Sequence, residues 1–175
     1  HTPKVNFRQR GYLFLVDDAS ADRFEARVER QRSIGARVER LNLDQIRARM
    51  PDIRLDDIRF GVFGSHDGYL EPREVLAGFR AAASAADVDY VTAEVVDLVM
   101  RSGQVEGVVL NSGERLAADA VVNAAGPFAS RLAAMAGIHL PVEPVRQHLF
   151  RCALPEQWPY RFPMVIDPTG VHWRH

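Results

Sequence analysis

Two arginines and two histidines within residues 146–174 carry side chains that can act on a small anionic or amine ligand. Arg146 and Arg174 can each pair with a carboxylate through two parallel hydrogen bonds. His148 and His172 carry imidazole side chains, a type that can serve as an acid–base group or steer an amine. Surface ion pairing is the commoner role of an arginine, and plain hydrogen bonding that of a histidine on a strand. No spacing of histidine, cysteine and acidic residues is typical of a metal site.

A second candidate site is the junction between an apolar run and a helix start. The run Ala120–Ala125 lacks alternation, as expected of a strand buried on both faces. Gly126 has no Cβ, so a ligand can approach its backbone closely, and Pro127 suits a first helical position. Helical spacing predicts a helix that ends at Gly137. Free N–H groups at such a start attract phosphate, although an ordinary strand–helix junction has the same pattern.

Composition narrows the class of protein. The chain has 175 residues, of which 47% are hydrophobic, and a net charge of −1. These values predict a folded core of one domain or two partial ones, and they argue against nucleic acid or an anionic membrane as the main partner. No apolar run approaches the roughly 20 residues of a membrane-spanning helix, and no signal-peptide pattern opens the chain. Because Cys152 is the single cysteine, a reducing compartment is permitted, and we expect a cytoplasmic protein.

The first part of the chain alternates between strands and helices. A strand is predicted at Gly11–Val16, and a surface helix with a thin buried stripe that includes Ile34 over Ser20–Gly35, capped by Ser20. A short helix is predicted over Asn42–Pro51, whose start has the pattern of a capping box. An extended stretch follows at Phe60–Gly64. Glu71 and Pro72 then open an amphipathic helix that runs to about Ala86.

The second part is rich in strand and turn signals. Val91–Met100 and Val105–Leu110 predict a hairpin, and a further strand leads towards Leu116. A strand is also predicted from Val145, and another hairpin over Met164–His175. Since the chain lacks an initiator methionine and its last residues read as an interrupted strand, we expect an internal piece of a longer protein.

Four segments in this order resemble the flavin-dependent D-amino-acid oxidase superfamily, which includes glycine oxidase, sarcosine oxidase and dimethylglycine dehydrogenase. Asp67–Pro72 is similar to the family's acidic-proline helix start, with Glu71 in place of the usual aspartate. The strand and hairpin over Val95–Glu114 match the family order. Ala118–Ala129 resembles its strand–glycine–helix motif, and Leu140–Gln147 resembles its return into the substrate-binding sheet.

The resemblance implies an α/β fold with α+β character, made of part of a Rossmann-like FAD-binding domain and part of a mixed-sheet substrate-binding domain. It places partial substrate-binding domain at residues 1–60, the second part of the FAD domain at 61–138, and a truncated return into the substrate domain at 139–175. Under it, Arg146, His148, His172 and Arg174 lie on the substrate side, and Arg8 and Arg10 face the flavin entrance.

The cofactor implied by the resemblance is FAD. Val95 matches the position whose backbone holds the adenine edge, and Ala125 and Gly126 match the place where backbone passes the pyrophosphate or ribose. The family's G-x-G-x-x-G fingerprint does not occur in the chain. We therefore expect that these 175 residues alone do not hold FAD tightly, and that apolar surface left open favours self-association.

The activity implied by the resemblance is oxidation of the C–N bond of an amine or amino acid, with hydride transfer to the flavin and an electron acceptor left open. An alternative from another class is a flavin-containing assembly or binding factor with little turnover. A nicotinamide-dependent dehydrogenase fits less well, because such enzymes favour helical crossovers where this chain has a hairpin.

Overall fold

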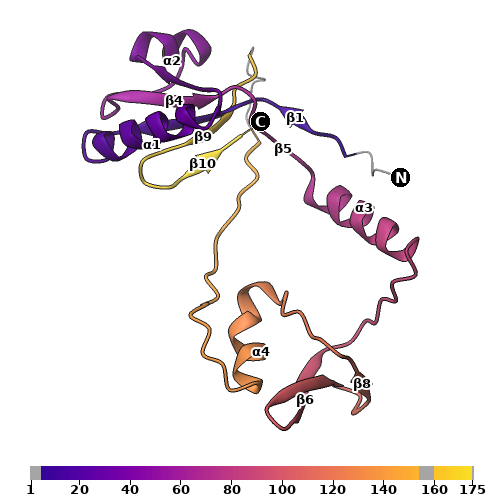
Figure 1. Ribbon diagram of the computed structural model, residues 1–175. Helices are drawn as coiled ribbons and strands as arrows, with labels where there is room; N and C mark the ends of the chain where they lie inside the picture. The colour runs from indigo at the N-terminus through magenta and orange to yellow at the C-terminus, as the bar shows by residue number, and fades with distance from the viewer. Residues whose placement is uncertain (1–4, 154–159, 175) are drawn as a thin grey trace. The chain divides into compact units, whose positions relative to one another are not determined.

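The computed structural model describes residues 5–153 and 160–174 and shows a mixed α/β protein (Figure 1). The chain divides into two compact units, residues 1–88 with 154–175, and residues 89–153. In sequence, the second unit is therefore inserted between two parts of the first. The domain boundaries expected after residues 60 and 138 stay a prediction.

A five-stranded sheet in the order β10-β9-β2-β4-β3 forms the centre of the first unit. Its strands are β2 (Tyr12–Val16), β3 (Val38–Leu41), β4 (Phe60–Gly64), β9 (Met164–Ile166) and β10 (His172–Trp173). β2 and β4 confirm two predicted strands, and β9 with β10 confirms the predicted C-terminal hairpin, whereas β3 was not predicted. β2 pairs antiparallel with β4 and parallel with β9. The same unit contains the short pair β1 (Arg8–Gln9) and β5 (Gly68–Tyr69).

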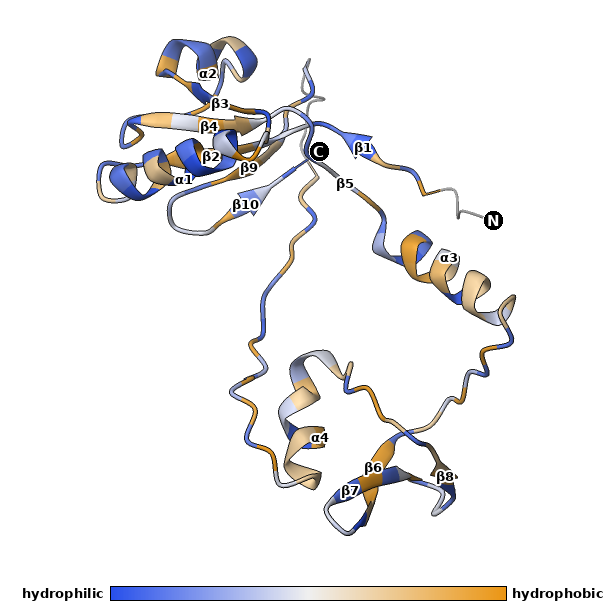
Figure 2. Cartoon of the chain, in the orientation of Figure 1, coloured by the Kyte–Doolittle hydropathy of each residue, from blue (hydrophilic) through white to orange (hydrophobic). Residues whose placement is uncertain are grey.

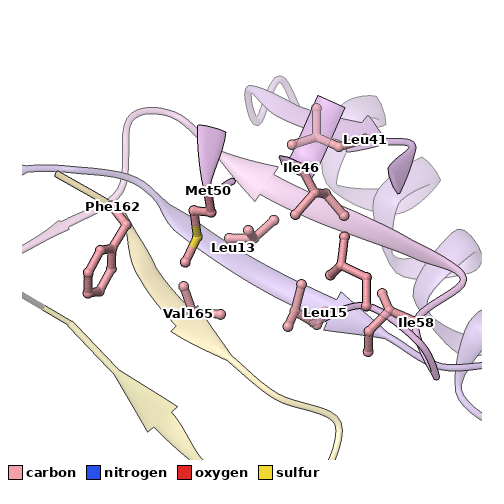
Figure 3. Close-up of a cluster of buried hydrophobic side chains, with 9 residues drawn as sticks. Leu13, Leu15, Leu41, Ile46, Met50, Ile58, Phe162 and Val165 are labelled. Atoms are coloured by element: carbon pink, nitrogen blue, oxygen red, sulfur yellow. The ribbon is translucent and has the colours of Figure 1, made fainter. Parts of the chain in front are cut away.

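Two helices pack on this sheet, α1 (Ala21–Ser33) and α2 (Leu43–Arg49). Successive side chains of a strand point to opposite faces, so β2 supplies both layers of the core. Leu13 and Leu15 point to one face and pack in a cluster with Ile46 of α2 (Figure 3). Val16 points to the other face, where Val28 of α1 covers it. Buried side chains thus lie on both faces of the sheet.

The start of α2 confirms the predicted capping box. The Asn42 side chain accepts a hydrogen bond of 2.8 Å from the backbone N–H of Gln45, and the Gln45 side chain accepts one of 2.9 Å from the backbone N–H of Asn42. Two N–H groups that a helix start leaves unbonded are satisfied in this way.

The start of α1 differs from the prediction. Ser20 precedes the helix but makes no capping bond, because its hydroxyl and its backbone N–H both donate to the Asp17 carboxylate. These bonds, the hydroxyl first, lower the pKa of Asp17 from its ordinary value of 3.8. At the other end, the helix stops before Gly35, at φ +85°, and Ile34 is 77% exposed instead of buried.

This pair predicts a pH-dependent effect of the substitution Ser20→Ala. A carboxyl whose folded pKa is lowered adds stability above its unfolded pKa, and that stability is lost as pH falls below about 4. We expect Ser20→Ala to lower the free energy of unfolding at pH 7 more than at pH 2, measured by urea titration. The control is Ser33→Ala, because Ser33 donates to the Arg30 carbonyl, which does not titrate. Equal effects of Ser20→Ala at both pH values would contradict the assignment.

The second unit contains a three-stranded antiparallel sheet and one helical segment. The strands are β6 (Val95–Arg101), β7 (Gln104–Leu110) and β8 (Arg115–Ala117). The helical segment is η1 (Gly126–Phe128) followed by α4 (Ala129–Met135). Ser102 and Gly103 have φ values of 51° and 79°, as in a tight hairpin turn, so the predicted hairpin is confirmed. The helix ends before Gly137, at φ +72°, as predicted.

Two strands predicted in the second unit are wrong. Residues 120–125 and 145–150 are not in strands, and no described strand pairs with them. Val122 is 87% exposed and Leu149 is 92% exposed. A strand needs neighbouring N–H and C=O groups to bond with, and an apolar pattern alone does not supply them.

The helix predicted at Glu71 is present as α3 (Pro72–Ser84) in the first unit. Pro72 occupies its first turn, and Glu71 makes no capping bond, consistent with its being a poorer cap than aspartate. Its apolar residues (Figure 2) are not buried, since Leu76 is 68% and Phe79 69% exposed. An apolar helix face exposed in this way favours self-association, which stays a prediction.

Candidate functional site

One face of the five-stranded sheet is only partly covered. Tyr12 and Phe14 of β2 point away from Leu13 and Leu15, and both are half-buried. Met164 lies opposite Tyr12, and Ile166 lies opposite Phe14, so all four side chains share this face. We call these four residues the open face. The ring of Phe24 in α1 lies 6.0 Å from that of Phe14 and covers its far end.

His172 extends the open face, and Arg174 follows two residues later in the sequence. His172 lies opposite Ile166 in the β9–β10 pair, and Trp173 alternates to the buried side, where it packs on the core cluster. Arg174 lies just beyond the last residue of β10. Its Cζ lies 3.9 Å from the ring centroid of Tyr69. The structure thus places the predicted substrate-side residue His172 on the open face and the predicted substrate-side residue Arg174 against Tyr69.

Tyr69 also contacts a second arginine. Arg8 lies directly opposite Tyr69 in the β1–β5 pair, and its Cζ is 5.9 Å from the same ring centroid. Among the described residues, neither Arg8 nor Arg174 makes a side-chain hydrogen bond or an ion pair with an acidic residue. We call Arg8, Tyr69 and Arg174 the arginine–tyrosine cluster. It is basic and partly exposed.

The remaining substrate-side candidates belong to the second unit. Arg146 and His148 are exposed and lie outside any strand, contrary to the strand predicted there. The His148 ring stacks on Phe150 at a centroid distance of 6.2 Å. Nothing in the second unit groups these two side chains with another titratable residue.

Val95 lies at the beginning of β6, opposite Leu110. β6 is an edge strand, because among the described residues it pairs with β7 alone. Backbone groups on its outer side therefore remain available, which suits recognition of an adenine edge by main-chain N–H and C=O. The geometry at Val95 fits the adenine-binding role that the resemblance implies.

Ala125 and Gly126 lie at the start of η1. Gly126 has φ +55°, and no atom outside its immediate neighbours lies within 4 Å of where a Cβ would be. The Asn123 side chain accepts from the N–H of Ala125 at 3.3 Å and donates to the carbonyl of Ala129 at 2.8 Å, which fixes the turn into the helix. This left-handed glycine therefore has open space beside its backbone.

A cavity in the first unit lies on the other side of the sheet. It has a volume of about 620 Å³, and its lining includes Trp173 and the acidic residues Asp52, Asp57 and Asp167. Acidic walls disfavour a carboxylate ligand, so this cavity is not the candidate site. In the described residues, no group of three or more histidine, cysteine and acidic side chains is placed to hold a metal ion.

Sequence reasoning missed part of this site. Tyr12 and Met164 were not singled out, although the alternation of aromatic and aliphatic residues in Gly11–Val16 separates the two faces of β2. The approach of Tyr69 to Arg174 carried no sequence signal, because it depends on pairing between distant strands.

The family model described as FAD dependent oxidoreductase (DAO) matches residues 1–174. The chain belongs to the DAO family. The predicted family is thereby confirmed, and FAD is the cofactor of that family. No helix in residues 5–153 or 160–174 is long and apolar enough to cross a membrane.

Individual relatives place this DAO-family chain within longer proteins. It is 28% identical to FAD-dependent oxidoreductase domain-containing protein 1 of Xenopus laevis, over 97% of this chain and 40% of that protein. It is 31% identical to sarcosine oxidase subunit beta of Rhizobium meliloti (strain 1021), over 77% of this chain and 34% of that protein. The structure of L-proline dehydrogenase from P. horikoshii matches with a TM-score of 0.78 and 22% identity, covering 98% of this chain and 47% of that one.

The chain spans less than half the length of each of these three proteins. The structural match confirms the predicted fold class, since the mixed α/β chain aligns with part of the DAO fold.

Proposed function

We propose that the chain is part of an FAD-dependent enzyme that oxidises the C–N bond of an amine or amino acid. The observation that carries this proposal is the open face with Arg174 beside it, in a chain of the DAO family. Tyr12 and Met164 offer apolar surface, and the guanidinium offers two parallel donors for a carboxylate. The names of two similar proteins, sarcosine oxidase subunit beta and L-proline dehydrogenase, support this substrate class.

Each candidate residue has a distinct role in the proposal. Arg174 orients the substrate through its carboxylate, so that the amine end lies over the open face. His172, exposed on the open face, would act as an acid–base group. Arg146 and His148 stay candidates for the substrate side, with weaker support because the second unit leaves them in exposed coil.

The cofactor would be held by backbone groups. Val95 would hold the adenine edge through the outer side of β6, and Ala125 with Gly126 would let the pyrophosphate or ribose approach the chain. When bound, FAD supplies the oxidising chemistry by accepting a hydride from the carbon next to the substrate nitrogen. The protein contributes binding, orientation and exclusion of water. The electron acceptor and a cytoplasmic location stay predictions.

The test uses an FAD-loaded protein that contains residues 1–175 and is as long as the relatives. Reduction of its flavin is measured without oxygen. Sarcosine, proline, glycine and D-amino acids are added in turn, and the flavin absorbance is followed. We expect at least one of them to bleach the flavin. If all leave the flavin oxidised, the proposed enzyme activity is wrong.

Residues 1–175 by themselves are expected not to hold FAD tightly. The chain has no G-x-G-x-x-G sequence, and residues 120–125 form no strand that would support a cofactor. Purification in the presence of FAD followed by an absorbance spectrum measures this directly. A stoichiometric flavin spectrum after desalting would contradict the expectation.

A further inference from the structure

The arginine–tyrosine cluster brings two positive charges to one aromatic ring. Arg174 Cζ lies 3.9 Å and Arg8 Cζ 5.9 Å from the Tyr69 ring centroid. The two guanidinium carbons are therefore at most about 10 Å apart, the sum of these two distances. The negative face of the ring attracts a guanidinium at such range and helps to hold each one in place.

This pair of charges lacks a counter-charge within the described residues. Some arginines of the first unit pair with acidic residues, such as Arg40 with Glu25 at 2.6 Å and Arg54 with Asp56 at 3.0 Å, and other described arginines, such as Arg30, do not. Arg8 and Arg174 have no acidic partner within residues 5–153 and 160–174. Two like charges at this separation repel each other, and a ligand with two negative groups relieves that repulsion.

The geometry of the cluster also suits two separate anionic groups. Arg8 projects from β1, and Arg174 follows β10, so the two guanidinium groups reach the ring from different strands. Each guanidinium can bind one carboxylate through two parallel hydrogen bonds. A ligand with a single carboxylate would leave one of the two arginines without an anion.

We propose that Arg8 and Arg174 bind the two carboxylates of one ligand, and that the substrate is therefore an amine with two acidic groups. This inference rests on the proposed function for its link to oxidation. The binding itself does not depend on FAD or on turnover. Tyr69 acts as a positioning residue, since its ring holds both guanidinium groups near each other.

The test uses succinate, acetate and inorganic phosphate as probes, titrated into residues 1–175 at low ionic strength and followed by calorimetry. We expect succinate to bind at least about tenfold more tightly than acetate. Arg8→Gln and Arg174→Gln should each remove most of that preference, while Arg174→Lys should keep part of it. Arg30→Gln is the matched control, because Arg30 is an exposed residue of α1 with the same charge and should leave succinate binding unchanged.

Three results would overturn the proposal. They are equal affinity for succinate and acetate, equal affinity for succinate and phosphate, and an effect of Arg30→Gln as large as that of Arg8→Gln. If the arginine variants do not fold, the melting temperature of the unsubstituted chain is the alternative measurement. We then expect succinate to raise the melting temperature more than acetate does at matched ionic strength, and equal increases would overturn the proposal.

The two proposals fail independently. If succinate binds but no amine reduces the flavin, the proposed enzyme activity is contradicted and the proposed anion site is retained. If sarcosine reduces the flavin but succinate binds no more tightly than acetate, the proposed dicarboxylate site is contradicted and the proposed enzyme activity is retained.

Discussion

Replacing Phe60 by alanine is expected to lower the free energy of unfolding of the first unit by about 3 to 5 kcal/mol. Phe60 is fully buried in β4, in the cluster that α1 closes over the sheet. The Arg40 guanidinium lies 4.1 Å from its ring centroid, held there by an ion pair with Glu25. The substitution removes both the ring packing and this cation–π contact, and it leaves a cavity.

Urea titration followed by circular dichroism measures this loss. The matched control is Phe79→Ala, because Phe79 has the same side chain but is 69% exposed on α3. We expect a change within about 0.5 kcal/mol for the control. A native domain is stable by only about 5 to 15 kcal/mol, so the Phe60 variant should be visibly unfolded at moderate temperature. Similar effects of the two substitutions would show that the buried cluster is not formed in solution.

Replacing Gly107 by alanine is the second large effect, and it concerns the second unit. Gly107 lies opposite Ala117 in the β7–β8 pair. A Cβ at Gly107 would lie inside contact distance of the Leu116 carbonyl oxygen and 3.1 Å from the Cα of Ala117. Both are backbone atoms that cannot rotate away, so β8 must move. We expect a loss of about 2 to 3 kcal/mol, at the upper end for overpacking.

Amide hydrogen exchange distinguishes this local effect from general unfolding. In Gly107→Ala, protection should fall for the Ala118 amide, which bonds to the Glu106 carbonyl at 2.9 Å, while the β6–β7 pair stays protected. Gly113→Ala is the control, since Gly113 has φ +85° with open space around it and should cost about 1 kcal/mol from backbone strain alone. Unchanged protection in Gly107→Ala would contradict the register of β8.

Local features were predictable from the sequence because their causes are local. The Asn42 and Gln45 capping box depends on two side chains three positions apart, and the hairpin turn depends on Ser102 and Gly103. The aromatic and branched residues of Gly11–Val16 likewise predicted the strand β2. The family resemblance, carried by four short segments in order, predicted the family and the fold class.

Features that depend on distant partners could not be predicted in this way. Residues 120–125 have the composition of a buried strand, yet burial requires a neighbour that no described strand provides. The spacing of its apolar residues correctly predicted the helix α3. Their exposure could not be predicted, because it depends on what packs against the helix. The contact of Arg174 with Tyr69 joins residues far apart in the chain, so only the three-dimensional arrangement reveals it.

The parallel pairing of β2 with β9 has a consequence for synthesis on the ribosome. These strands are separated by about 150 residues, and the whole second unit is made between them. At ~5–20 residues per second, roughly 8 to 30 s pass before β9 emerges. During that interval β2 can pair with β4 but has one free edge. The nascent chain therefore exposes an apolar strand edge for seconds, which is the period in which chaperone binding would protect it from aggregation.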